Sequence, residues 1–235
     1  MAKHRVRSGF LTWFGRGLLA CGLILGAYAG WNYWGSDVFY AQAQDDLAKQ
    51  YSAPAASTTT DQPKAKAFVD PAAATHLADI FGRIYVPKLG DGYSRLVAEG
   101  VRWHPVLNEI GIGHYPNTQL PGEVGNFAVA AHRGGFGGAF KNIHRLIAGD
   151  HVYVETNDGW YSYVYRQTKI VKPKDVDVIA PVPRELAGAE VGGRYLTLTS
   201  CNPIFVNTTR IIVWFELEST GTLKQGPPRA LRPIG

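Results

Sequence analysis

The chain has 235 residues, 46% of them apolar and 18% charged, so it can bury one sizeable core and is too short for a large multidomain machine. Its two cysteines exclude a disulfide-dense scaffold, and no Cys/His cluster has the spacing of a structural zinc site. Four of the 24 basic residues precede residue 37, and no acidic residue does. The rest of the chain has 20 basic and 19 acidic residues, a net charge of +1. Such a near-neutral body lacks the basic surface that nucleic-acid binding needs, so nucleic acid is not an expected partner.

The N-terminal part of the chain predicts a transmembrane anchor. Residues 17–36 carry no charge, and 13 of these 20 residues are apolar. As a helix they would span about 30 Å, the thickness of a bilayer core. Basic residues precede the segment and acids follow it, which predicts that residues 1–16 are cytoplasmic and that the rest is extracellular. Trp31, Tyr33 and Trp34 would lie at the outer interface.

A cleaved signal peptide is the alternative, because Ala27-Tyr28-Ala29 supplies an A-x-A site after a short apolar region. The length of the charge-free segment and its aromatic end favour an uncleaved anchor. In either case the body of the protein is exported.

Residues 37–79 are rich in Ala, Ser, Thr, Pro, Gln and Asp without apolar periodicity. Such a segment cannot offset its ordering entropy, so we expect a flexible extracellular stalk. Residues 219–235 are expected to form a loose C-terminal tail, since the last ten residues carry three prolines and no pattern.

Residues 80–218 show short alternating runs broken by turn residues, which indicates an all-β barrel or sandwich in a single domain. Asn157-Asp158-Gly159 has the composition of a hairpin turn. Short helices are expected over residues 140–147 and near residues 183–189. The runs that predict strands are residues 80–86, 126–131, 151–156, 160–166, 194–200 and 210–218.

Cys201 is the one cysteine after the charge-free segment, and it ends a predicted strand just before Asn202-Pro203. Most free cysteines are small buried hydrophobes. A lone exported thiol with histidines elsewhere in the chain also fits the requirement for covalent acyl transfer. Spacing alone leaves both interpretations open.

His132 is the best candidate for the base of such a thiol. It closes the apolar run 127–131 and is followed by Arg-Gly-Gly, so a strand would deliver it to an open loop. His114 lies in a loop that could line a groove or merely turn. The histidines that fit a solvated or internally satisfied role are His76, His104, His144 and His151.

Arg210 follows Cys201 by nine residues and heads the apolar run 211–215. It could cap the strand in solvent. It could instead hold a developing oxyanion, because a guanidinium keeps its charge and offers forked donors.

Together these residues resemble the sortase family. Residues 197–201, Thr-Leu-Thr-Ser-Cys, resemble the T-L-x-T-C motif, residues 130–133, Ala-Ala-His-Arg, resemble the G-H-R strand end, and the arginine follows in the same order. The resemblance covers about residues 80–218. The segments most similar to class E sortases of actinobacteria are residues 111–122, residues 149–150 with 154–156, and residues 201–203.

The resemblance implies an eight-stranded β-barrel that cleaves a C-terminal sorting signal between threonine and glycine and joins the threonine carbonyl to a cell-wall amine. Cys201 would be the nucleophile, His132 the proton carrier and Arg210 the oxyanion donor, with no metal or organic cofactor. The partners would be surface proteins carrying the signal and, as acceptor, a wall precursor or a pilin lysine. The residues expected to contact substrate are Tyr115, which would favour L-A-x-T-G over L-P-x-T-G, His114, Thr199, Ser200 and Asn202.

The sequence departs from the family pattern near the site. Ser200 replaces a threonine but keeps the hydroxyl, Ala131 replaces a glycine, and Gly134-Gly135-Phe136 replaces a more polar stretch. Two other functions use the same residues. One is a cysteine peptidase in which water resolves the thioester. The other is a tethered peptide-binding barrel in which Cys201 only fills space.

Overall fold

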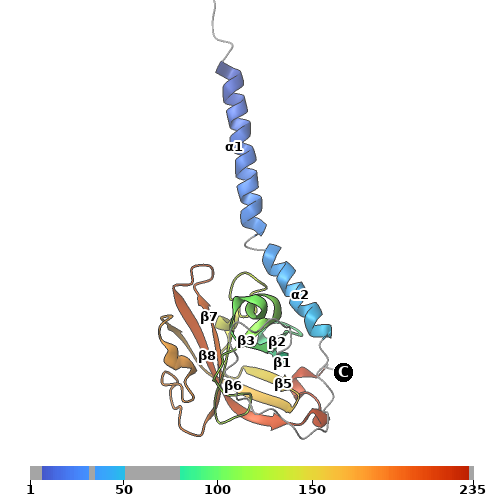
Figure 1. Ribbon diagram of the computed structural model, residues 1–235, viewed down its shortest axis with the longest axis vertical. Coiled ribbons are helices and arrows are strands. Elements are labelled where there is room, and N and C mark those ends of the chain that lie inside the picture. The colour runs from blue at the N-terminus through green and yellow to red at the C-terminus, as the bar shows by residue number, and fades with distance from the viewer. Residues whose placement is uncertain (1–6, 32–34, 51–79, 233–235) are drawn as a thin grey trace, which may run out of the picture.

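The computed structural model describes residues 7–31, 35–50 and 80–232. Its body is a closed eight-stranded barrel with the strand order β1-β2-β3-β4-β7-β8-β6-β5, which confirms the predicted all-β fold (Figure 1). The strands are β1 Ile80–Tyr85, β2 Ser94–Glu99, β3 Gly111–His114, β4 Gly125–Ala131, β5 His151–Thr156, β6 Gly159–Val171, β7 Arg194–Asn202 and β8 Thr209–Gly221.

All six runs predicted as strands are strands, but β2 and β3 were not predicted. Four consecutive residues of β2 are buried, so the alternation that marks a half-buried strand is absent there. β3 has only four residues, two of them glycine, and is typical of a loop by composition. The parallel pairing of β2 with β3 requires a crossover, which is provided by the helical segment Trp103–Ile110, wound as a π-helix.

The prediction of two short helices inside the domain is wrong. Residues 140–147 contain a single 3-10 turn, Ile143–Arg145, and residues 183–189 form turns. The apolar spacing in the first segment has another cause. Phe140, Ile143 and Leu146 are buried in the barrel core, whereas Ile147 is 57% exposed.

Each strand divides its side chains between the barrel interior and its outer face. On β7, Leu196 and Leu198 belong to the interior core, and on β8 so do Ile211 and Val213. Because side chains alternate along a strand, Cys201, an odd-numbered residue of β7, lies on the outer face. The register of the core therefore determines which β7 side chains are available for chemistry.

The N-terminal helix α1, Arg7–Gly30, extends away from the barrel (Figure 1). Its residues Leu11–Gly30 are long and apolar enough to cross a membrane, a test that a signal sequence also passes. The helix therefore agrees with the predicted anchor but begins before residue 17. Tyr33 and Trp34 lie outside the described residues.

A second helix, α2 Ser36–Gln50, corrects the expectation of a flexible stalk over its first residues. Ala48 is buried with Leu96 of β2 and Val106 of the Trp103–Ile110 segment, so tertiary packing supplies the stabilisation that composition did not indicate. Residues 51–79 of the predicted stalk lie outside the described residues. The predicted tail is likewise not loose throughout, because β8 continues to Gly221 and two 3-10 turns, Leu223–Gln225 and Arg229–Leu231, follow it.

Candidate active site

Three neighbouring strands bring the predicted catalytic residues into one row. In the antiparallel pair β7 and β8, Cys201 lies directly opposite Arg210. In the parallel pair β4 and β7, Ala130 is level with Thr199, and His132 follows the last residue of β4, so extending this register by two residues brings His132 level with Cys201. Adjacent strands are about 4.8 Å apart, and residues in register point to the same face. His132, Cys201 and Arg210 therefore share the outer face of the barrel.

The Cys201 thiol is partly exposed at the end of β7. This position disagrees with the interpretation of Cys201 as a buried filler, because its side chain lies outside the core formed by Leu196 and Leu198. A partly exposed thiol is accessible to a peptide carbonyl, as a nucleophile requires.

His132 is half-buried between aromatic rings. Its ring centroid lies 5.8 Å from that of Trp103 and 5.1 Å from that of Phe136. Burial lowers the pKa of His132, and the carboxylate of Asp37 on α2 opposes part of this shift. The His132 Nε2 atom lies 2.8 Å from Oδ1 of Asn108. At neutral pH the imidazole is therefore neutral and able to accept a proton.

Arg210 is held by the loop between β7 and β8. Its Nη1 donates to the backbone oxygens of Asn207, at 3.0 Å, and Thr209, at 2.8 Å. These bonds use one of the three guanidinium nitrogens, so the fork keeps further N–H groups for a ligand. Two backbone carbonyls therefore fix the direction of the Arg210 side chain, which lies opposite Cys201.

Tyr115 and Thr199 lie next to the row. The Tyr115 hydroxyl is 2.9 Å from Oγ1 of Thr199, which is on the outer face two residues before Cys201. Tyr115 is partly buried against the apolar cluster that includes Ala130. Thr199 is only 4% exposed, so the partly exposed Tyr115 is the member of this pair that a bound peptide can reach.

The structure corrects two of the predicted substrate contacts. His114 is only 3% exposed, and its Nδ1 lies 2.6 Å from Oε2 of Glu99 while its Nε2 lies 2.8 Å from Oγ1 of Thr118. Ser200 is 4% exposed and donates to the backbone oxygen of Ala131 at 2.7 Å. Both side chains are buried and hydrogen-bonded within the protein, which disfavours direct contact with substrate.

Asn202, also predicted to contact substrate, is engaged at the base of the β7–β8 loop. Its Oδ1 accepts from Arg133, and its Nδ2 donates to Oγ1 of Thr209 at 3.0 Å. The amide thus joins the loop after His132 to the loop before Arg210. This role makes Asn202 a support of the site rather than a surface for the peptide.

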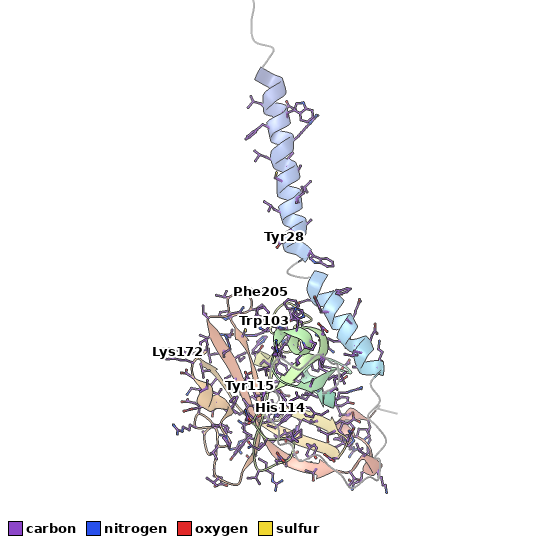
Figure 2. All side chains as sticks on the ribbon, in the orientation of Figure 1. Tyr28, Trp103, His114, Tyr115, Lys172 and Phe205 are labelled. Carbon is purple, nitrogen blue, oxygen red and sulfur yellow. The ribbon has the colours of Figure 1, made fainter. Side chains whose placement is uncertain are left out.

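Gly134, the first glycine after His132, has a packing role. A Cβ added at Gly134 would lie 2.7 Å from a ring carbon of Phe205, so only glycine allows the β7–β8 loop to approach this closely. Figure 2 shows Phe205 and Trp103 at the end of the barrel near α2. Phe205 is 46% exposed and Trp103 66% exposed, which gives the row an apolar border.

Sequence reasoning missed three residues around His132: Trp103, Asn108 and Gln44. The first two come from the unpredicted Trp103–Ile110 segment, and Gln44 comes from α2, which was expected to be stalk. No local pattern marks them, because each reaches the site only through the packing of its element on the barrel.

The family model for the sortase domain matches residues 84–218. The chain belongs to the sortase family. Sortase SrtE2 of Streptomyces coelicolor is 32% identical over 97% of this chain and 90% of its own length. Sortase SrtE1 of the same organism is 36% identical over 64% of this chain and 44% of its own length.

Solved sortase structures agree with this assignment. Sortase E from Streptomyces avermitilis is 43% identical with a TM-score of 0.60, and the match covers 66% of this chain and 97% of that structure. Sortase E1 from Streptomyces coelicolor, solved with a tripeptide in its active site, is 33% identical with a TM-score of 0.62 over 66% of this chain and 97% of that structure. The expected similarity to class E sortases of actinobacteria is confirmed.

Proposed function

We propose that this sortase is a membrane-anchored cysteine transpeptidase that cleaves a C-terminal sorting signal between threonine and glycine and transfers the threonine acyl group to a cell-wall amine. The observation that carries the proposal is the row of His132, Cys201 and Arg210 across three neighbouring strands, with the thiol partly exposed. Membership of the sortase family supports transpeptidation of sorting signals.

The chemistry divides one amide exchange into two acyl transfers. Neutral His132 takes the proton of the Cys201 thiol, and the resulting thiolate attacks the threonine carbonyl while Arg210 binds the oxyanion. The protonated His132 then gives this proton to the glycine nitrogen as the C–N bond breaks. This leaves a thioester on Cys201. An incoming amine then attacks the thioester, His132 takes its proton, and the C–S bond breaks to regenerate the thiolate.

Tyr115 is proposed to contact the peptide, because its hydroxyl lies on the Cys201 face, and the buried Thr199 is proposed to orient that hydroxyl. The tripeptide in the active site of the Streptomyces coelicolor sortase E1 supports a short peptide as ligand. By its position Tyr115 is proposed to favour L-A-x-T-G over L-P-x-T-G. Surface proteins with such a signal would be the substrates, and a wall precursor or a pilin lysine the acceptor.

Incubation of the full chain in detergent micelles with an L-A-x-T-G peptide is expected to give an acyl adduct on Cys201, detected by mass spectrometry. Addition of a primary amine should convert the adduct to the amide product. Cys21, the cysteine in α1, provides the matched control: Cys21→Ala should keep the adduct and Cys201→Ala should lose it.

Two outcomes would contradict this proposal. Hydrolysed peptide as the sole product, even with excess amine, would indicate a cysteine peptidase. No adduct and no turnover with either signal peptide would favour a non-catalytic peptide-binding barrel.

The proposed topology has its own test. If α1 is an uncleaved anchor with a cytoplasmic N-terminus, protease added to intact cells should release the barrel and leave a membrane-retained stub. The basic residues before the apolar segment and the acids after it are the physical reason. A soluble secreted product beginning near Gly30 would show that the segment is a cleaved signal peptide.

A further inference from the structure

Asn108 connects two histidines. Its side chain is fully buried within the Trp103–Ile110 segment, with Nδ2 2.9 Å from Nε2 of His104 and Oδ1 2.8 Å from Nε2 of His132. An amide nitrogen only donates and an amide oxygen only accepts. With the amide in this orientation, Nε2 of His104 must accept from Nδ2 and Nε2 of His132 must donate to Oδ1, whereas the reversed amide would invert both bonds.

Glu109 settles the direction of this chain of hydrogen bonds. Its Oε1 lies 3.2 Å from Nδ1 of His104, and because a carboxylate only accepts, that nitrogen carries the proton. The Nε2 atom of neutral His104 then accepts from Nδ2 of Asn108. The amide oxygen is left to face His132, where it accepts the Nε2–H. Every bond from His132 to Glu109 thus runs in one direction.

Helix α2 holds the same asparagine from the other side. Gln44 is 1% exposed, and its Nε2 donates to the backbone oxygens of Asn108, at 3.3 Å, and Phe136, at 3.1 Å. One side chain of α2 therefore ties together Asn108 and Phe136, two of the residues that contact the His132 ring. The ion pair between Asp37 and Lys141, at 3.0 Å, fixes α2 to the loop after His132.

We propose that Asn108 is a positioning residue that holds His132 with its proton on Nε2 and its lone pair on Nδ1, and that Gln44 of α2 keeps Asn108 in place. His132 then offers Nδ1 as the base. The inference rests on the proposed function only for its kinetic consequence, since the tautomer is a property of the free protein. It also makes α2 part of the catalytic centre rather than a spacer.

The direct test is NMR of the full chain, labelled with ¹⁵N-histidine, in detergent micelles. Neutral His132 is expected to show a protonated Nε2 and an unprotonated Nδ1. Asn108→Ala should give a mixture of tautomers, whereas Asn108→Asp keeps an oxygen acceptor and should retain the Nε2–H signature at a pH high enough for His132 to be neutral, because the carboxylate also raises the pKa of His132. A folded wild-type protein with the proton on Nδ1, or an unchanged signature in Asn108→Ala, would overturn the proposal.

The kinetic test compares kcat and KM. Asn108→Ala should lower kcat by about 10²-fold or more with KM little changed, because a wrong tautomer forfeits general acid/base catalysis. His104→Ala and Gln44→Ala should lower kcat less, in proportion to their loss of the Nε2–H signature. The matched controls are His151, which also pairs with a surface carboxylate, and Gln42, which is exposed on α2.

His151→Ala and Gln42→Ala should leave both kcat and the NMR signature unchanged. Equal losses in Gln42→Ala and Gln44→Ala would mean that α2 contributes only general stability and would overturn the role of Gln44. Failure of the proposed function is distinguishable, because a protein without transpeptidase activity would still show the His132 tautomer and its dependence on Asn108.

Discussion

His132→Ala is expected to lower kcat/KM by about 10²- to 10⁴-fold, the usual contribution of a general acid/base group, while the barrel still unfolds cooperatively. The imidazole lies on the outer face between Trp103 and Phe136, outside the interior core, so its loss leaves the barrel packing intact. Steady-state transpeptidation and a melting curve measure the two effects separately.

His144→Ala and His151→Ala serve as controls and should each retain most activity, since neither residue lies beside Cys201. His104→Ala is excluded as a control by its bond to Asn108. Near-normal activity in His132→Ala, or collapse of activity in His144→Ala, would contradict the assignment of the base.

The pH dependence of kcat/KM should also report His132. Burial lowers the pKa of His132 below its ordinary value of 6.5. The imidazole therefore remains neutral, and able to accept a proton, at a lower pH than an exposed histidine would. We expect the acid limb of kcat/KM that reports His132 to lie below pH 6.5.

Arg210→Lys is expected to lower kcat/KM by about 10²- to 10³-fold, on the order of 3 to 4 kcal/mol, although the charge is kept. A lysine lacks the planar fork, so it cannot both donate to the carbonyls of Asn207 and Thr209 and present further N–H groups to an oxyanion. Arg210→Ala should lose at least as much. The measurement pairs kcat/KM with melting curves and the rate of Cys201 alkylation.

Arg194→Lys is the matched control, because Arg194 lies at the opposite end of β7 and also donates to a backbone carbonyl, that of Gly122. It should leave the rate unchanged. If Arg210 were only a strand cap, its replacement would cost about 0 to 1 kcal/mol of stability and no rate. Wild-type rates in both Arg210 variants would show that catalysis needs only Cys201 and His132 and would contradict the proposed role of Arg210.

The local sequence pattern predicted most strands of the barrel. It failed for strands whose burial is caused by segments distant in the sequence. β5 has the predicted bounds because Val152 and Val154, two residues apart, enter the interior core and mark a period of two in the sequence. In β2, four consecutive residues are buried and no such period can be detected. The spacing of Phe140, Ile143 and Leu146 predicted a helix, but these residues enter the core through turns around one 3-10 turn. Apolar spacing reports which residues are buried and does not specify the backbone that buries them.

The sequence by itself determined the three catalytic candidates, because Cys201 and His132 each close an apolar strand and Arg210 opens one. Only the tertiary structure decided which of their neighbours could meet substrate. Ser200 adjoins Cys201 in the chain yet faces the interior, since successive side chains of a strand point to opposite faces. Gln44 and Asn108, 64 residues apart, meet beside His132 because α2 packs on the barrel. That packing depends on surfaces formed by distant segments, which no local pattern encodes.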